Sequence, residues 1–474
     1  MELRGKKVTV VGMGRTSLAL VRLLLREGAF PFVTDSGDSE SLEALRGELD
    51  ALGVPYECGQ HTETAFDGAS LVVPSPGVSP SIPSIQRARS AECIVLGEIE
   101  LASRFCRAKI VAVTGTNGKT TTTELIRALI ANTNTSVVLA GNNATPLSEA
   151  VMVSSQPEIV VLEMSSYQLE TATGFRPWIG AMLNVSPDHL ARHKTLHEYA
   201  HVKAKLFANQ RKGDHAVLNA DDPLVREVTP PDGVSRWWFT LNEAAPFSIR
   251  EGDHLLRVSG TQWILDDEAI AGLDDTPLPG RHNLQNVAAA LCVAKAAALD
   301  WDAVLHALRV FKGVEHRIEY VTTIGEVAYY NDSKSTNLDS LRVALESFEP
   351  ASESSPGSIV LIAGGRGKDS EYSTLTDIVR ARVTALCVFG EDAAALEASF
   401  GEVVPVTRCN DLAVAVRAAA DVARPGDIVL FSPACASFDQ FRDFEHRGRV
   451  FKELVAGLGE NSPVSDKSNQ ECAT

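Results

Sequence analysis

Short apolar runs that end in polar or glycine-rich turns recur along the whole chain. Near its start, KKVTVVG leads through a glycine-bearing turn to the helix-like SLALVRLLLREG and then to FPFVTD. Apolar strands that alternate with helical patterns in this way predict βαβ units and parallel sheets. Similar units begin near residues 108 and 312. Because 474 residues also exceed what one core normally holds, the sequence predicts several α/β domains.

The segment VAVTGTNGKTTTTELIRALI, residues 111–130, has the pattern of a strand, a turn and a helix start. A phosphate-binding loop needs inward backbone N–H groups, a helix N-terminus, a lysine and a hydroxyl for magnesium. The turn supplies all four, although Val113 replaces the first glycine of the G-x-x-x-x-G-K-[ST] pattern. The alternative is a structural turn with an exposed lysine. We expect phosphate groups to bind at Gly115, Thr116, Asn117, Gly118, Lys119 and Thr120.

Three successive α/β domains follow from these patterns. We expect a Rossmann-like domain at 1–107, a central P-loop ATPase-like parallel sheet at 108–311, and a second Rossmann-like domain at 312–460. The polar, aperiodic end of the chain predicts a disordered tail at 461–474.

Composition excludes several classes of protein. The formal net charge is −17 and is spread along the chain, which argues against a general nucleic-acid or membrane-surface protein. We find no apolar run of about 18 residues and no signal-peptide pattern at the start. The eight cysteines include no C-x-x-C pair, so we expect reduced thiols in a cytoplasmic protein.

The N-terminal turn, residues 12–17 (GMGRTS), has two glycines of the dinucleotide-binding fingerprint and serine in the third glycine's place. Asp35 ends the second strand, where a ribose-binding acid belongs. The later loop LVVPSPGVSP adds Ser75, Pro76 and Gly77 at the same sheet edge. The fingerprint alone is weak evidence, because tight packing of a strand against a helix also explains it.

Polar side chains gather where parallel strands end, which is where α/β sheets bind ligands. The set is Lys119, Glu163, Asn184, Asp188, Asn331, Asp332, Lys334 and Lys368. Glu163 ends an apolar run, so we expect it to be half buried. A divalent cation would offset the cost of burying its charge. The alternative is that it caps the helix that follows.

The stretch DHLARHKTLHEYAHVKAKLF contains histidines at every fourth position from 189 to 201. Thr195 and Glu198 form a capping-box pattern, so we expect a helix to begin after Thr195 and leave His189 and His193 in a loop. His197 and His201 are then expected on a solvated face rather than at zinc. At 100° per residue, Lys203 falls within the apolar face of this helix. Such a lysine is neutral, paired or modified unless its stem reaches outward to water.

Seven motifs together resemble the ATP-dependent muramyl ligases. They are GTNGKTTT, LEMSSYQLE, LNVSPDH, the Y-x-x-x-K helix at residues 199–203, NDSKSTN, GGRGK and SPACASFDQFRDFEHRG. The last motif and the short N-terminal unit resemble the D-glutamate-adding branch of that family. Two positions depart from its pattern: Gly37 stands where arginine occurs, and Phe438 where leucine is commoner.

The resemblance implies a role for each candidate residue. The N-terminal domain would hold a UDP-sugar rather than NAD, through Gly14, Arg15, Thr16, Asp35, Ser75, Pro76 and Gly77, with Asn142 at this substrate or at the ATP phosphates. ATP would bind at the turn from Gly115 to Thr121 and at Asn286, Arg317 and Asp332. One magnesium would bind Thr120 and Glu163, and a second His189 and Lys203, which would be carbamylated by carbon dioxide. D-Glutamate would be surrounded by Lys334, Thr336, Lys368, Ser437 and Phe444.

The implied activity is an amide ligation in peptidoglycan precursor synthesis. ATP would phosphorylate the carboxylate of UDP-N-acetylmuramoyl-L-alanine, and the amine of D-glutamate would displace phosphate from the acyl phosphate. Lys119, Glu163, His189 and Lys203 would be the catalytic residues. We expect small-molecule substrates, no nucleic acid, no membrane insertion, and a monomer.

Other functions remain open on sequence grounds. Another muramyl ligase, or a glutamate ligase like folylpolyglutamate synthase, would share GTNGK, although the N-terminal unit argues against the latter. A nucleotide-regulated binding module without catalysis would not need Lys119, Glu163 and Lys203, and all three are present. A Rossmann dehydrogenase is disfavoured by Ser17 and by a phosphate loop that hydride transfer does not use.

Overall fold

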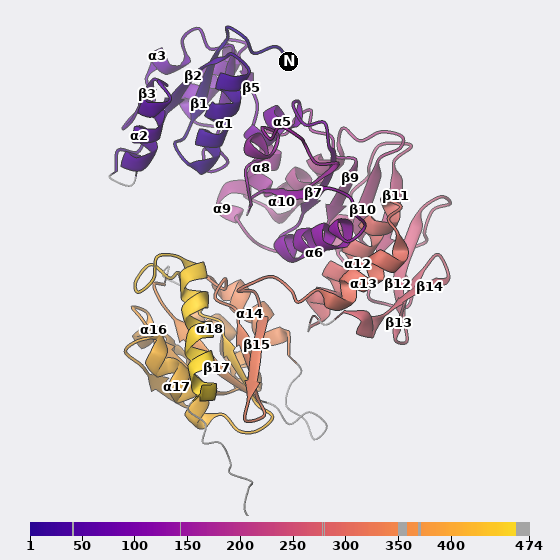
Figure 1. The fold of residues 1–474 in the computed structure, drawn as a ribbon, viewed down its shortest axis with the longest axis vertical. Coiled ribbons are helices and arrows are strands. Elements are labelled where there is room, and N and C mark those ends of the chain that lie inside the picture. Colours follow the sequence, from indigo (N-terminus) through magenta and orange to yellow (C-terminus); the bar gives the residue numbers. More distant parts are fainter. Residues whose placement is uncertain are drawn as a thin grey trace, which may run out of the picture. The chain divides into compact units, whose positions relative to one another are not determined.

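The computed structural model describes residues 1–39, 42–142, 144–276, 278, 280–348, 358–367 and 371–460. It forms two compact units, one built mainly from residues before 312 and the other mainly from residues after it (Figure 1). The predicted tail at 461–474 lies outside the described residues. None of the helices that these residues form has both the length and the apolarity of a membrane span.

The first sheet is entirely parallel and has the order β3-β2-β1-β4-β5. Its apolar strands are joined by helices, as the alternating sequence pattern predicts. The strands are β1 (Lys7–Val11), β2 (Phe30–Thr34), β3 (Tyr56–Glu57), β4 (Leu71–Pro74) and β5 (Ile94–Val95). The helices are α1 (Arg15–Arg26), α2 (Glu43–Ala51), α3 (Glu63–Phe66), α4 (Pro83–Ser90) and α5 (Glu98–Ser103).

The second sheet has the order β14-β13-β12-β11-β10-β9-β6-β8-β7 and is parallel from β7 to β12. β13 and β14 extend it as an antiparallel hairpin. The parallel strands are β6 (Lys109–Thr114), β7 (Val137–Gly141), β8 (Ile159–Glu163), β9 (Ile179–Met182), β10 (His215–Asn219), β11 (Ser235–Phe239) and β12 (His254–Ser259). The hairpin comprises β13 (Gln262–Leu265) and β14 (Glu268–Gly272).

Helices cover both faces of this second sheet. Alternate residues of β6 enter different cores: Val111 and Val113 pack with α6, α12 and α13, whereas Ile110 and Ala112 pack with α7, α8 and α10. The helices are α6 (Lys119–Ala131), α7 (Leu147–Ala150), α8 (Ser166–Glu170), α9 (Leu190–His193), α10 (Leu196–Ala204), α11 (Pro223–Arg226), α12 (Arg281–Ala296) and α13 (Trp301–Val310).

The first and second sheets belong to one unit because their helices share a core. Leu23 of α1 is fully buried in the same cluster as Leu147 of α7 and Ala102 of α5. Burying one leucine side chain stabilises a fold by about 1.5–3 kcal/mol. The buried carboxylate of Glu98 also accepts a hydrogen bond from the Ser148 backbone N–H at 2.6 Å.

The third sheet lies in the second unit and has the order β15-β16-β20-β17-β18-β19. Among the described strands of this sheet, only the β15–β16 pair is antiparallel. The strands are β15 (Glu319–Ile324), β16 (Val327–Asn331), β17 (Ile359–Gly364), β18 (Val383–Phe389), β19 (Val406–Arg408) and β20 (Ile428–Phe431). The helices of this unit are α14 (Leu338–Glu346), α15 (Thr376–Arg382), α16 (Ala393–Phe400), α17 (Leu412–Val422) and α18 (Phe444–Glu460). Figure 1 labels α14, α16, α17 and α18.

Candidate active site

The predicted phosphate loop lies between the end of β6 and the start of α6. Gly118 caps α6 with φ +84°, a conformation that side chains with a Cβ rarely adopt. A Cβ added there would also lie 2.2 Å from Oδ1 of Asn286. Because the first N–H groups of an α-helix have no partners within the helix itself, the start of α6 is a position that favours an anion.

Asn184, which follows β9, holds this loop in shape. Its Oδ1 accepts hydrogen bonds from the backbone N–H groups of Thr116 (3.1 Å) and Asn117 (2.9 Å). Its Nδ2 donates to the carbonyl of Asn117 at 3.1 Å. Asn184 therefore fixes the loop from a neighbouring strand end, as expected for polar residues gathered at one sheet edge.

Two lysines donate to the same backbone carbonyl. Lys203 Nζ lies 2.8 Å from the Gly115 oxygen, and Lys119 Nζ lies 3.0 Å from it. Lys119 also donates to the carbonyl of Thr116 at 2.7 Å. Lys203 is only 1% exposed, so its stem does not reach outward to water. Burial lowers the pKa of Lys203 well below its ordinary value, and the charge of Lys119 lowers it further.

Glu163 ends β8 and is more deeply buried than predicted, with 2% exposure. Asn142 Nδ2 donates to its Oε1 at 3.1 Å. The capping alternative is wrong, because Ser165 caps α8 in a reciprocal capping box with Gln168. Thr120 is also buried, in the first turn of α6. A buried carboxylate and a hydroxyl at adjoining strand and helix ends offer the oxygen ligands that magnesium prefers.

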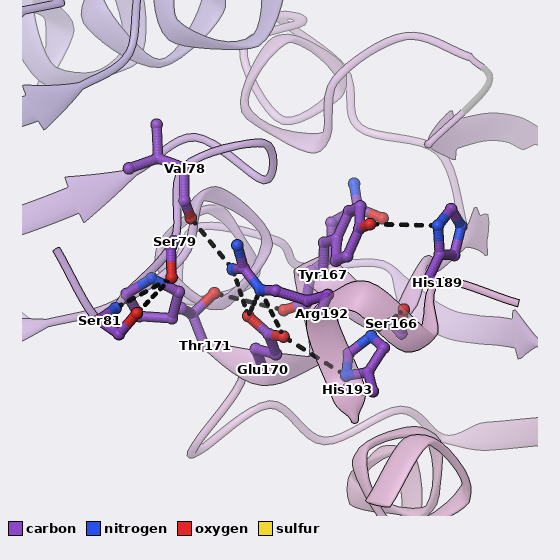
Figure 2. Close-up of polar contacts among 12 residues, drawn as sticks. Val78, Ser79, Ser81, Ser166, Tyr167, Glu170, Thr171, His189, Arg192 and His193 are labelled. Atoms are coloured by element: carbon purple, nitrogen blue, oxygen red, sulfur yellow. Dashed lines mark hydrogen bonds and ion pairs between the residues drawn. The ribbon is translucent and has the colours of Figure 1, made fainter. Parts of the chain in front are cut away.

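His189 stands before α9 in a left-handed conformation, with φ +53°. Its Nδ1 lies 3.1 Å from the Tyr167 hydroxyl (Figure 2). Its Nε2 lies 3.3 Å from Asp188 Oδ2. Tyr199 joins this group, because its ring centre lies 6.4 Å from that of His189. Lys203 Nζ lies 4.3 Å from the centre of the Tyr199 ring. The helical period of the sequence revealed the unusual position of Lys203. Nothing in the sequence marked Tyr167 as a site residue except its place in the LEMSSYQLE motif.

The other histidines of this stretch do not form a zinc site. His193 does not lie in a loop, as the sequence predicted, but ends the short helix α9. It is buried, with Nε2 3.0 Å from Ser166 Oγ. Thr195 does cap α10, accepting from the Glu198 N–H at 3.1 Å. His197 and His201 are exposed on α10, as predicted.

The predicted N-terminal loops meet at the edge of the first sheet. Ser17 Oγ donates to the carbonyl of Gly12 at 2.6 Å and lies 2.8 Å from Ser75 Oγ. The serine in the third fingerprint position thus ties the β1–α1 turn to the loop after β4. Asp35 Oδ2 accepts from the Met13 N–H at 2.6 Å. Its Oδ1 accepts from the N–H of Gly37 at 2.7 Å. These contacts bring together the loops that hold Gly14, Arg15, Thr16, Asp35, Ser75, Pro76 and Gly77.

Asn286 lies on α12 in the first unit, beside the phosphate loop. Its Oδ1 accepts from the hydroxyl of Thr122 at 3.2 Å, and its Nδ2 donates to Oδ1 of Asn283 at 3.1 Å. Asn286 is 4% exposed. The contact across α6 and α12 places it directly against Gly118, which the sequence spacing did not reveal.

Arg317 and Asp332 belong to the second unit. Asp332 is buried and accepts hydrogen bonds from Ser432 Oγ (2.7 Å) and the Ile318 N–H (3.2 Å). Burial raises its pKa to about 7, against the opposing effects of the Ser432 hydrogen bond and the Arg317 charge. Because this pKa is about 7, the Asp332 carboxyl group is partly protonated near neutral pH.

Lys334 and Phe444, two predicted D-glutamate contacts, lie together in the second unit, with Lys334 Nζ 5.7 Å from the ring centre. A buried arginine that the sequence did not single out, Arg447, joins the two motifs around them. It donates to the carbonyl of Ser333 at 2.8 Å and to that of Cys435 at 3.0 Å. Ser437 is buried and Thr336 is partly buried. Lys368 lies outside the described residues.

Comparison with protein families agrees with this architecture. Three family models match in order: "Mur ligase MurD-like, N-terminal domain" at residues 6–97, "Mur ligase middle domain" at 113–294, and "Mur ligase, glutamate ligase domain" at 316–435. The chain belongs to the Mur ligase family. The predicted family and the predicted three-domain α/β fold are thereby confirmed.

Curated relatives share the family over nearly the whole chain. The protein named UDP-N-acetylmuramoylalanine–D-glutamate ligase from Acidobacterium capsulatum is 41% identical, covering 96% of this chain and 97% of that protein. The protein of the same name from Koribacter versatilis is 40% identical, with 97% and 99% covered. The prediction that this chain is a ligase enzyme is also confirmed.

Solved structures show the same fold at lower identity. A UDP-N-acetylmuramate–alanine ligase from Thermotoga maritima is 20% identical, with a TM-score of 0.55 over 95% of this chain and 99% of the other. The MurF ligase of that organism, solved with ADP, is also 20% identical, with a TM-score of 0.57 over 96% of each chain.

Proposed function

We propose that this ligase joins D-glutamate to UDP-N-acetylmuramoyl-L-alanine, with cleavage of ATP to ADP and phosphate, as a step of peptidoglycan precursor synthesis. The observation that carries the proposal is the turn at residues 115–118, where two lysines converge on one carbonyl before the start of α6. The names of the relatives and the match to the D-glutamate-type N-terminal domain support the choice of substrates.

The first step activates a carboxylate. A carboxylate is a poor electrophile because oxide is a poor leaving group. In the proposed step, an oxygen of the L-alanyl carboxylate attacks the γ-phosphorus of ATP, and the bond to the β–γ bridging oxygen breaks to release ADP. Lys119 turns from its own loop carbonyls to the β- and γ-phosphates, where its charge stabilises the transferring group. Thr116, Asn117 and Thr121 line the same turn.

Magnesium would bind at two places, the first with oxygen ligands already present and the second with oxygen supplied by a carbamate on Lys203. Thr120 and Glu163 would hold one ion, and His189 and Lys203 a second. When bound, such ions neutralise charge on the phosphates during transfer. Asn142, which donates to Glu163, would orient that carboxylate and lie near the substrate phosphates.

Lys203 suits carbamylation because its amine is buried and its pKa is lowered. The free amine would attack carbon dioxide, forming an N–C bond and releasing one proton. The product is an anion, which replaces a buried cation beside Lys119 and supplies oxygen ligands to magnesium.

The second step forms the amide. The amine of D-glutamate attacks the acyl carbon, and the tetrahedral intermediate expels phosphate together with the oxygen that came from the carboxylate. We propose that Lys334, Thr336, Lys368, Ser437 and Phe444 surround D-glutamate, and that Asn286, Arg317 and Asp332 contact the nucleotide. Lysine ammonium groups would pair with the carboxylates of the amino acid. The N-terminal loops would hold the UDP-sugar. The cytoplasmic location and the monomeric state stay predictions, as do the domain limits.

Phosphate release tests the substrate assignment. We expect ATP-dependent release with UDP-N-acetylmuramoyl-L-alanine and D-glutamate, and little with L-glutamate, L-lysine or L-alanine. Release with L-glutamate but not D-glutamate would overturn the assignment. Turnover of a folate acceptor in place of the UDP-sugar would instead favour a folylpolyglutamate-synthase-like activity.

A further inference from the structure

Arg192 lies where the end of α8 contacts the loop after β4. It belongs to α9, three residues after His189, and its guanidinium contacts Glu170, the last residue of α8 (Figure 2). Nε lies 3.0 Å from Oε1 of Glu170, and Nη2 lies 2.6 Å from Oε2. Two parallel charge-assisted hydrogen bonds of this kind fix the orientation of the guanidinium plane.

The same guanidinium also reaches the first sheet. Nη2 donates to the carbonyl of Val78 at 3.3 Å. Val78 is in turn fixed within its loop, because its N–H donates to the carbonyl of Ser75 at 2.9 Å. Ser75 Oγ lies 2.8 Å from Ser17 Oγ, which is in the first turn of α1, directly after the β1–α1 turn. One arginine is thus connected, in three steps, to both loops that we propose as the UDP-sugar site.

Arg192 is also connected to the predicted magnesium ligands. Its guanidinium carbon lies 5.3 Å from the centre of the Tyr167 ring, and the Tyr167 hydroxyl lies 3.1 Å from His189 Nδ1. Figure 2 shows these side chains in one group beside Glu170 and His193. Arg192 is therefore placed between the loop of one proposed substrate and the residues that flank the phosphate loop.

Thr171, which follows α8, packs closely against Gly97, which precedes α5. The carbonyl of Thr171 accepts from the Gly97 N–H at 3.3 Å. A Cβ added to Gly97 would lie 2.2 Å from Thr171 Oγ1, so the backbones approach closely. Exposed ion pairs contribute little to the free energy of unfolding. The Arg192–Glu170 pair is better shielded from water, because its side chains are only 21% and 14% exposed.

We propose that Arg192 is a positioning residue that sets the UDP-sugar loop against the phosphate-transfer site. This inference rests on the proposed function. Because Arg192 contacts neither reacting group in this account, its loss should misplace the bound carboxylate relative to ATP without emptying either substrate site. Lysine cannot replace it, because one ammonium cannot span both oxygens of Glu170 and the carbonyl of Val78.

The test compares R192K with R176K. Arg176 makes a matched pair, with Nε and Nη2 at 2.6 and 2.9 Å from the carboxylate of Asp214, but inside the central domain. For R192K we expect kcat to fall about 10- to 100-fold. The affinities for ADP and for UDP-N-acetylmuramoyl-L-alanine, measured by calorimetry, should change less than threefold. R176K should keep the kcat of the wild type.

Hydrogen–deuterium exchange supplies a readout that does not depend on activity. We expect faster exchange of the Val78 amide in R192K and not in R176K. E170Q, which keeps the arginine but removes the charge that anchors it, should shift both kcat and exchange in the same direction by a smaller amount.

The outcomes separate this inference from the proposed function. If wild-type enzyme turns over the UDP-sugar and R192K matches R176K in kcat and in Val78 exchange, the positioning role is wrong. If R192K loses affinity for ADP and for the UDP-sugar alike, Arg192 is only structural, which also overturns the inference. If wild-type enzyme does not turn over the UDP-sugar while Val78 exchange still depends on Arg192, the proposed substrate is wrong and the contact stands.

Discussion

Lys119 and Lys203 are held 3.0 and 2.8 Å from one carbonyl oxygen, so a positive charge on both amines at once would be unfavourable. The repulsion between them adds to the cost of burying Lys203. Conversion of Lys203 to an anion and transfer of Lys119 to phosphate would both relieve it. Both events of the proposed mechanism would therefore remove the repulsion between the amines of Lys119 and Lys203.

Substituting Lys203 tests its modification. K203A should lower activity by about 100-fold or more, because it removes an anionic ligand from the transfer site. Formate or acetate should restore part of the activity by supplying a carboxylate in the space left. K205A, two residues further along the chain, should neither lose as much activity nor respond to the acids. Full activity of K203A would contradict the role.

The buried carboxyl group of Asp332 predicts a pH-dependent stability. Its pKa is raised to about 7 from 3.8, so the folded chain favours the protonated form. The charged carboxylate lowers the free energy of unfolding. This loss is absent below pH 3.8, grows as pH rises, and is complete above about pH 7. D332N should therefore melt higher than wild type at pH 8, by about 2–6 °C, with a smaller difference at pH 5.

Calorimetric melting of the full chain at both pH values measures this effect. D332N should also lose activity if Asp332 contacts the nucleotide, so a gain in stability would accompany a loss of function. Equal melting temperatures at pH 8, or a difference that does not shrink at pH 5, would show that the charge on Asp332 costs nothing.

Residues differ in how far the sequence reveals them. Lys203 was recognisable because a charge inside an apolar helical face conflicts with its surroundings. Arg192 was not, because its hydrogen bond to Val78 joins residues 114 positions apart in the chain. The full burial of Glu163 was also underestimated, because a strand end gives no sign of the elements that cover it.

At the scale of elements, the glycine at the N-cap of α6 decides whether the phosphate loop forms. G118A would add both a strained φ and a Cβ 2.2 Å from Asn286 Oδ1. G213A has a similar φ of +90° but opens onto empty space, so it measures the backbone strain alone, about 1–2 kcal/mol. We expect G118A to lose ADP binding in calorimetry and G213A to retain it.

The strands before polar turns were predictable because each is a short apolar run. The antiparallel extension β12–β14 was not singled out. Its turn between β13 and β14 uses Asp266 and Asp267, with φ of +49° and +72°, where an Asn-Gly or Asp-Gly pair gives the usual hairpin signal. Two aspartates adopt these left-handed conformations at a higher free-energy cost than glycine would. The residues of this turn therefore give only a weak signal for the hairpin that the structure contains.

At the scale of the whole molecule, the order of the three domains was predictable from motif order, and the family models match in that order. The joining of the first two sheets into one unit was not, because it depends on a shared core of α1, α5 and α7. The apolar face of α1 indicates burial but not the partner.

Transfer of oxygen from the alanyl carboxylate to phosphate would show directly that ATP activates this carboxylate. UDP-N-acetylmuramoyl-L-alanine labelled with ¹⁸O in its alanyl carboxylate is incubated with ATP and D-glutamate, and the released phosphate is examined by mass spectrometry. We expect the phosphate to acquire one ¹⁸O for each amide formed from a fully labelled carboxylate. Phosphate without label, formed at the same rate as the amide, would contradict activation of the carboxylate by the γ-phosphate.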